Sequence, residues 1–332
     1  MKIIYAGSPL ASAMVLSNLL TLIKESSISS QVEFAGVLTN PPSPKGRSKE
    51  LIPTEVSTLA KSRNIPVFEF DHIRQEAIEA ISPLQPDLLV TFDFGRIFGP
   101  KFLSIFKFGG INLHPSKLPL YRGCSPVPSA ILNGDSQLGI SVQKIALETD
   151  TGAIIAQSSI NLTGKETTLS LMEGDGKTSP VTLEGSKLLF ETIKKFVSAS
   201  SPEDVPSTLQ TGTATFTNFI KKEDGLINWN TEAASIERKI RAYTPWPLCS
   251  TFFNGQKLSL LQAEISPLSE KITDSTIVPG TVLPFRKDSG IEIMCEKGTV
   301  LLVKQLQLQG KKPMDYKSFV NGARNFFGTI LG

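Results

Sequence analysis

Residues 1–24 of the chain are MKIIYAGSPLASAMVLSNLLTLIK, an apolar strand pattern followed at once by a helical one. Residues 3–6 are too few for the apolar core of a signal peptide and predict a first β-strand. Ser8 and Pro9 favour the start of a helix, with Ser8 as N-cap and Pro9 in the first turn. The apolar face of that helix consists of Val15, Leu19, Leu20, Leu22 and Ile23.

The same alternation of strand and helix continues through the first half of the chain. Further apolar runs occupy residues 34–38, 67–70 and 88–92, with helical patterns between them. This order predicts an α/β fold whose sheet is doubly wound, Rossmann-like and mostly parallel. Ligands of such sheets bind beyond the carboxyl ends of the strands, so a site is expected at that edge.

A second domain is predicted after a polar stretch rich in Ser, Pro and Thr. This stretch, residues 197–213, has the composition of a linker between a catalytic domain, residues 1–196, and a C-terminal domain, residues 214–332. Asn254-Gly255 in the C-terminal domain predicts a hairpin with a type I′ turn. A helix at 232–242 precedes further strand patterns at 281–285, 291–295 and 300–308. Short antiparallel strands in this number fit an OB-like β-barrel.

Composition narrows the class of protein. The chain has 332 residues, 40% of them hydrophobic, and 34 Lys+Arg against 31 Asp+Glu, so neither a disordered chain nor a polycation is expected. Cys124, Cys249 and Cys295 are too scattered for a disulfide framework or a metal clip and are expected to be reduced thiols. Without an 18-residue apolar stretch, a cytoplasmic protein without a membrane span is expected.

The segment GGINLHPSKLPLYRG, residues 109–123, carries the residues with the most chemical character. Asn112 and His114 stand two residues apart, so they share one face of a strand at its carboxyl end. The other histidine, His72, lies in a helix-start context, which leaves His114 as the candidate imidazole acid or base. Asp150, in a turn, can orient that imidazole. A structural histidine and an acid that caps its own turn explain the same spacing.

Three motifs in this order resemble the signature of the folate-dependent formyltransferases. They are Asn-x-His, a Ser-x-Leu-Pro run directly after it, and an Asp-Thr-Gly whose Asp lies 36 residues beyond His114. Within that family the chain most resembles, over nearly its full length, the members that act on methionyl initiator tRNA. Further segments that carry this resemblance are residues 5–9, 39–53, 219–229, 240–247 and 310–314.

The resemblance implies a role for each matching residue. Asn112, His114 and Asp150 would be catalytic. Ser116, Leu118 and Pro119 would lie in the folate-binding segment, together with Lys117, which stands where the family usually has Leu. The stem of Lys117 can cover apolar surface while its ammonium stays in water. Arg47, in a basic loop, would approach the acceptor end of the tRNA.

Charge suggests where the tRNA body binds. Residues 211–332 hold 15 Lys+Arg against 11 Asp+Glu, so the C-terminal domain is the more basic part of the chain. The lysines expected to contact tRNA phosphates are Lys221, Lys222, Lys311 and Lys312. Ordinary solvated faces explain the same modest excess.

The expected reaction is formyl transfer from 10-formyltetrahydrofolate to the α-amino group of methionyl initiator tRNA, by a monomer that needs no metal. Asn112 would donate an N–H to the oxyanion, His114 would move a proton, and Asp150 would favour the imidazolium. Gly7-Ser8-Pro9 stands where Gly-x-Gly-x-x-Gly would cradle a dinucleotide, so neither NAD nor FAD is expected.

Three alternatives stay open. A formyltransferase for a nucleotide-sugar amine would have the same three catalytic residues. One for a purine ribonucleotide precursor would not need the C-terminal barrel. A non-catalytic RNA-binding OB protein would not need Asn112, His114 and Asp150 together. Assay of formyl-methionine on charged initiator tRNA separates these readings.

Overall fold

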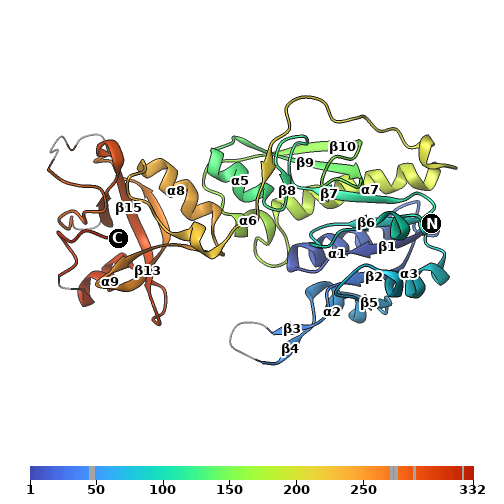
Figure 1. The fold of residues 1–332 in the computed structure, drawn as a ribbon, viewed down its shortest axis with the longest axis horizontal. Coiled ribbons are helices and arrows are strands. Elements are labelled where there is room, and N and C mark those ends of the chain that lie inside the picture. The colour runs from blue at the N-terminus through green and yellow to red at the C-terminus, as the bar shows by residue number, and fades with distance from the viewer. Residues whose placement is uncertain (45–48, 270–271, 273–275, 287–288, 324) are drawn as a thin grey trace. The chain divides into compact units, whose positions relative to one another are not determined.

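The computed structural model describes residues 1–44, 49–269, 272, 276–286, 289–323 and 325–332. The chain forms two compact units, labelled by their elements in Figure 1. The first unit contains Met1–Pro126, Gln137–Leu162 and Ser170–Asn218, and the second contains Val127–Ser136, Thr163–Leu169 and Phe219–Gly332. Neither unit is one continuous stretch of chain, and the domain limits expected from composition stay a prediction.

A mixed sheet forms the centre of the first unit. Its strands lie in the order β10 (Ile154–Asn161), β9 (Gln137–Lys144), β7 (Gly110–His114), β6 (Leu88–Thr91), β1 (Lys2–Ala6), β2 (Glu33–Thr39) and β5 (Val67–Glu69). Pairing is parallel from β7 to β5, and antiparallel where β9 joins β7 and β10 joins β9. The predicted mostly parallel, Rossmann-like sheet is therefore confirmed.

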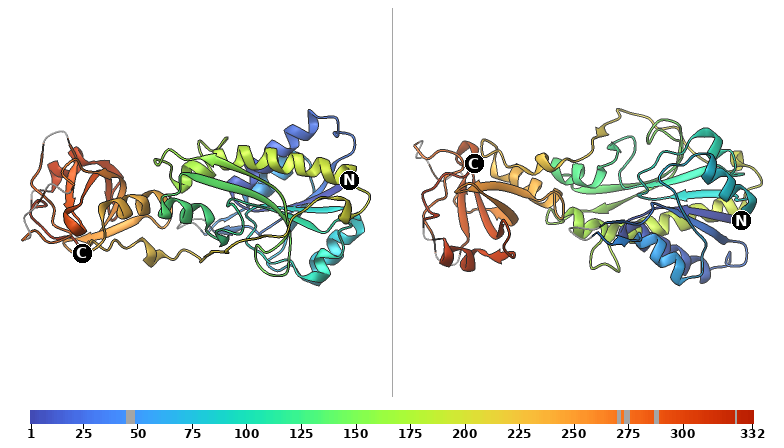
Figure 2. Two further views of the ribbon diagram at one scale, coloured as in Figure 1. Left: turned by 90° about the horizontal axis from the view of Figure 1, so that it is seen from above. Right: turned by 60° about the horizontal axis from the view of Figure 1, so that its bottom comes forward.

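Helices cover both faces of this sheet (Figure 2). One face carries α1 (Leu10–Lys24), α2 (Glu55–Ser62) and α7 (Pro180–Ser198), and the other carries α3 (Gln75–Ile81) and the short α4 (Pro100–Leu103). Ile4 and Ala6 of β1 belong to the apolar cluster around α3 and α4, while Ile3 and Tyr5 are equally buried. Burial of both faces explains why these strands are apolar at nearly every position.

The start of α1 differs from the prediction. The helix begins at Leu10, Pro9 occupies the N-cap position, and no side chain caps the first turn. The Ser8 hydroxyl instead lies 3.2 Å from Thr39 Oγ1 and accepts a hydrogen bond of 3.1 Å from the Asn40 amide. The prediction that Ser8 caps the helix is wrong, because its hydroxyl is engaged at the end of β2.

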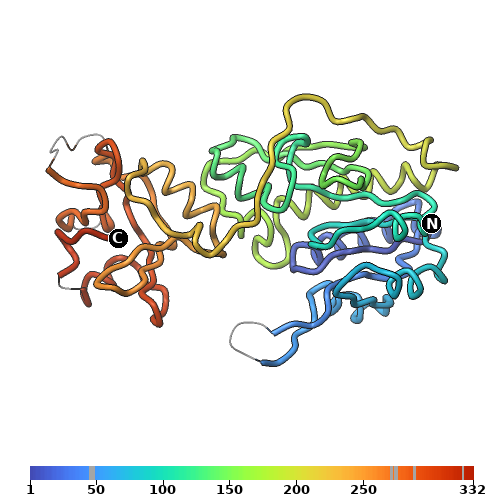
Figure 3. Tube along the Cα trace, in the orientation of Figure 1, coloured from blue at the N-terminus to red at the C-terminus, as the bar shows by residue number. Residues whose placement is uncertain are grey.

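Residues 197–213, expected to be a linker, belong to the first unit. After η2 (Pro202–Asp204) the chain runs back along the edge strand β10, as the yellow part of the tube in Figure 3 shows. Thr208 exchanges two backbone hydrogen bonds of 2.8 Å with Ile154. Beyond it, β11 (Phe216–Thr217) pairs in parallel with β8 (Arg122–Gly123). The segment from 208 to 217 is thus hydrogen-bonded to β10 at one end and to β8 at the other.

The shorter elements belong to the first unit or contain residues of both units. They are β3 (Ser43–Pro44), β4 (Leu51–Ile52), η1 (Ser82–Leu84), α5 (Pro126–Asn133) and α6 (Thr168–Met172). β3 pairs with β4 and so closes the base of the predicted basic loop.

The second unit is built on a curled antiparallel sheet. Its order is β12 (Cys249–Phe253), β13 (Gln256–Ile265), β15 (Val300–Leu308) and β14 (Ile291–Met294), with β16 (Met314–Asp315) also on β15. The remaining elements are α8 (Ala233–Ala242), α9 (Tyr316–Gly322), η3 (Lys222–Gly225) and η4 (Glu296–Gly298). This curled sheet is the half-barrel form of the small OB-like β-domain that the sequence predicts.

Two local predictions in the second unit have different outcomes. Asn254 and Gly255 have φ angles of +49° and +72°, which confirms the type I′ turn between β12 and β13. Residues 281–285, predicted as a strand, form only the isolated bridges Thr281–Ile330 and Val282–Ile293 at their first two positions. Among the residues that the structure describes, no helix is both long and apolar enough to span a membrane.

Candidate active site

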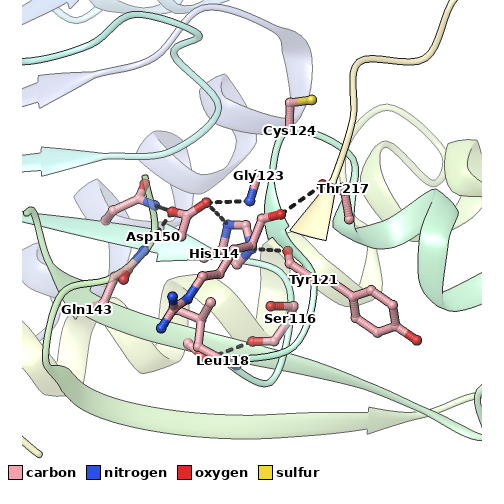
Figure 4. Close-up of polar contacts among 12 residues, drawn as sticks. His114, Ser116, Leu118, Tyr121, Gly123, Cys124, Gln143, Asp150 and Thr217 are labelled. Carbon is pink, nitrogen blue, oxygen red and sulfur yellow. Dashed lines mark hydrogen bonds and ion pairs between the residues drawn. The ribbon is translucent and has the colours of Figure 1, made fainter. Parts of the chain in front are cut away.

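His114 is the last residue of β7, and its ring lies between two acceptors (Figure 4). Nδ1 is 3.6 Å from Asp150 Oδ2, and Nε2 is 2.9 Å from the Tyr121 carbonyl oxygen. The side chains of His114 and Asp150 are 6% and 10% exposed. Nδ1 is close enough to the carboxylate for an ion pair when the ring is protonated, and Nε2 lies within hydrogen-bond distance of a carbonyl oxygen, which can only accept.

The carboxylate of Asp150 accepts hydrogen bonds from three other residues. Oδ2 accepts a 2.8 Å hydrogen bond from the Gly123 amide, and Oδ1 accepts one of 2.7 Å from Gln143 Nε2. The Asn112 amide nitrogen donates to Oδ1 over 3.3 Å. The structure therefore brings together Asn112, His114 and Asp150, and both carboxylate oxygens accept hydrogen bonds.

The turn that carries Asp150 is tightly seated between β9 and β10. Asp150 has φ of +55°, a left-handed conformation that Asp tolerates better than most side chains. Gly152 lies against β9 so closely that a Cβ there would sit 1.7 Å from the Lys144 carbonyl oxygen. Because the backbone has little room to shift, the direction of the carboxylate is set by the fold.

The predicted folate segment runs beside His114. Ser116 is fully buried, and its hydroxyl donates to the Leu120 carbonyl over 2.6 Å. Ser141 Oγ donates to the Ser116 carbonyl and accepts from the Leu118 amide, over 2.6 and 3.2 Å. Leu118 is buried and precedes Pro119 through a cis peptide bond, whereas Lys117 is exposed. Contacts of Ser116, Lys117, Leu118 and Pro119 with folate stay a prediction.

The residues predicted to bind tRNA lie apart from this cluster in the sequence. Lys221 and Lys222 are exposed at the start of η3, and Lys311 and Lys312 are exposed in the turn between β15 and β16. Arg47 lies outside the described residues.

Sequence reasoning missed two amide side chains beside Asp150. Gln143 is 2% exposed and pairs in register with Asn112 across β9 and β7. The sequence contained a signal for Gln143, because Ser141 and Gln143 are polar at alternate positions next to the apolar Ile140 and Val142. Gln210 lies in the stretch predicted as a linker, and no local pattern distinguishes it there.

Comparison with known proteins identifies the class. Residues 1–178 match the family model described as formyl transferase, and residues 219–324 match the one described as formyl transferase, C-terminal domain. The chain belongs to the formyl transferase family.

Individual relatives are more specific. A curated relative from Treponema denticola, named methionyl-tRNA formyltransferase, is 38% identical over 336 residues, which cover 98% of each chain. The solved methionyl-tRNA formyltransferase from Clostridium thermocellum is 17% identical, with a TM-score of 0.52 over 89% of this chain and 99% of that one. A sugar 3N-formyl transferase, solved in the presence of dTDP and 5-N-formyl-THF, is 17% identical, with a TM-score of 0.62 over 94% and 99% of the two chains. At these identities the two structures share the fold with this chain.

Proposed function

We propose that this chain transfers the formyl group of 10-formyltetrahydrofolate to the α-amino group of methionyl initiator tRNA. The observation that carries the proposal is the buried contact of His114 with Asp150, beside Asn112, at the carboxyl edge of a formyl transferase sheet. The name of the Treponema denticola relative, at 38% identity over both full lengths, favours the tRNA substrate over a sugar amine.

The residues at this edge fit a formyl donor. The folate co-substrate supplies an activated formyl carbon, and the family likeness to a sugar enzyme solved with 5-N-formyl-THF supports a folate of this type. Asn112 has a second amide N–H besides the one that it donates to Asp150, and His114 Nε2 would exchange its contact with the Tyr121 carbonyl for the substrate. Both side chains can then supply the donors that a carbonyl oxygen requires. Ser116 and Leu118 are buried, and this segment would form a wall beside the pterin of such a molecule.

Each of the three side chains then has a task in acyl transfer to an amine. Asn112 donates its N–H to the formyl oxygen as negative charge develops there. His114 carries a proton from the attacking amine to the departing nitrogen, so that the two proton transfers balance. Asp150 keeps the ring in place and offsets its positive charge while it does so.

The lysines of the second unit would hold the tRNA by its phosphates. Lys221, Lys222, Lys311 and Lys312 are all exposed, as phosphate contacts require. The loop between β3 and β4, which contains Arg47, would guide the acceptor end. The proposed enzyme acts as a monomer without a metal, in the cytoplasm where translation begins.

A transfer assay tests the proposal. Purified chain is incubated with radiolabelled methionyl initiator tRNA and 10-formyltetrahydrofolate, and formyl-methionine is measured after deacylation. Methionyl elongator tRNA and a nucleotide-linked amino sugar serve as matched acceptors. We expect rapid formylation of the initiator tRNA alone, and formylation of the sugar in its place would overturn the proposal.

A further inference from the structure

Gln210 reaches the catalytic turn from the segment between residues 208 and 217. The two backbone hydrogen bonds between Thr208 and Ile154, and the pairing of β11 with β8, hold this segment on both sides of Gln210. The backbone on both sides of Gln210 is therefore fixed, and the Gln210 side chain lies at the turn after β9.

The contacts of Gln210 allow one orientation of its amide. Oε1 accepts from Arg122 Nε over 3.1 Å and from Arg122 Nη2 over 2.7 Å. Nε2 donates to the carbonyl oxygens of Asp150 and Gly152, each over 2.8 Å. A guanidinium only donates and a carbonyl only accepts, so turning the amide over would break all four contacts. The oxygen of Gln210 must face Arg122, and its nitrogen must face the turn.

The same nitrogen also extends the chain of hydrogen bonds to the carboxylate. Gln210 Nε2 lies 3.3 Å from Gln143 Oε1, and Gln143 Nε2 donates to Asp150 Oδ1. Gln210 thus acts on Asp150 twice, through the backbone carbonyl and through Gln143. Because Asp150 is in a left-handed conformation, such outside contacts are what hold it there.

We propose that Gln210 is a positioning residue that holds the Asp150–Gly152 turn so that the carboxylate faces His114. The inference rests on the proposed catalytic roles of His114 and Asp150. In this proposal the segment between 208 and 217 is a part of the active site. It is held to the segment 109–123 by the hydrogen bonds between Gln210 and Arg122.

Gln210→Met tests this, because Met keeps the length of the side chain and removes its hydrogen bonds. We expect kcat to fall about tenfold to a hundredfold, because small displacements of a catalytic group are costly. The KM values for folate and tRNA should change by less than about threefold, because the groups that bind the two substrates stay in place. Leu209→Ala is the matched control, since Leu209 is the neighbouring residue and 76% exposed. It should behave as the parent chain.

A double-mutant cycle separates positioning from general folding. In an Asp150→Asn background, measured by single-turnover assay, Gln210→Met should cause almost no further loss, because its target carboxylate is gone. Gln143→Met and Gln210→Met should likewise be less than additive. Equal losses in both backgrounds, or a change in KM alone, would overturn the inference.

Two further results keep the test decisive. If Gln210→Met does not fold, Gln210→Glu replaces it, because Glu retains the acceptor for Arg122 and sets an oxygen against the two carbonyls. A parent-like kcat in Gln210→Glu with a folded chain overturns the inference. Parent-like rates in His114→Ala and Asp150→Asn would instead overturn the proposed function, so the two failures can be told apart.

Discussion

The predicted catalytic site of the first unit and the predicted tRNA-binding lysines of the second unit use polar side chains in opposite ways. In the first unit, Asp150 is 10% exposed and its carboxylate is surrounded by donors from β7, β8 and β9. In the second unit, the lysines expected to contact tRNA are exposed. Buried polar contacts are strong and directional, whereas exposed charges are screened and act over a wider range. Geometry should therefore govern the first unit and charge the second.

The reactivity of the cysteine thiols should show the largest difference between the two units. Burial raises the pKa of Cys249 and of Cys295, both in the second unit, to about 12. At pH 8 only about one in ten thousand such thiols is the reactive thiolate, and that fraction rises with pH up to the pKa. Cys124 of the first unit is exposed.

We expect iodoacetamide at pH 8 to label Cys124 at least about a thousandfold faster than the buried pair, because Cys124 is exposed and the buried thiols are almost entirely protonated. Peptide mass spectrometry over time follows the label. Cys124→Ser should remove the fast phase, and fast labelling of Cys249 would contradict the expected burial.

His114→Ala is expected to have the largest effect on catalysis. Loss of a proton carrier and of a donor to the developing oxyanion should lower kcat by about a hundredfold to a thousandfold. The His114 side chain is 6% exposed, so circular dichroism must show that the variant folds before its rate is interpreted. A folded variant with a parent-like rate would show that His114 takes no part in the mechanism. The geometry around Asp150 would then not distinguish the first unit from the second.

Gly139→Ala probes how closely the first unit is packed. A Cβ at Gly139 would lie 2.3 Å from the Lys117 amide nitrogen, so the folate segment or β9 must shift. We expect a loss of about 1–3 kcal/mol in the free energy of unfolding, measured with urea, as for other overpacked sites. Gly322→Ala in α9 of the second unit is the control, because nothing lies within 4 Å of its added methyl. A cost at both glycines would show that the difference in packing is not real.

The four lysines should show the smallest change in turnover. With Lys221, Lys222, Lys311 and Lys312 all changed to Ala, we expect KM for tRNA to rise about tenfold at low salt and its salt dependence to flatten. The kcat at saturating tRNA should stay near the parent value. The control carries the same loss of charge at four exposed lysines of the first unit: Lys24, Lys61, Lys101 and Lys107. An equal shift in KM from the control would mean that total charge, not position, governs binding.

Much of the first unit was predictable because its signals are local. The apolar runs of β1, β2 and β6 follow from side-chain period and burial alone, as do the limits of β15 in the second unit. Asn112 and His114 could be paired because alternate residues of a strand share a face. Ser8 could not be placed correctly, because its competing partners come from Thr39 and Asn40, far along the chain.

The polar stretch from 197 to 213 shows where prediction from sequence ends. Its composition resembles that of a linker, since Ser, Pro and Thr do not build a core. Its backbone nevertheless bonds to Ile154, and its Gln210 faces Asp150. Backbone hydrogen bonds are available to any residue type, so composition carries no record of them.

The amino-acid sequence by itself determined the doubly wound sheet, the family, and the side chains able to carry a proton and stabilise an oxyanion. Those properties depend on residue type and on spacing within one element. Only the tertiary structure decided that the Asp150 carboxylate meets His114 Nδ1, and that Gln143 and Gln210 support it from two other segments. The contacts of Gln210 join residues up to 88 positions apart, and only folding brings them within hydrogen-bond distance.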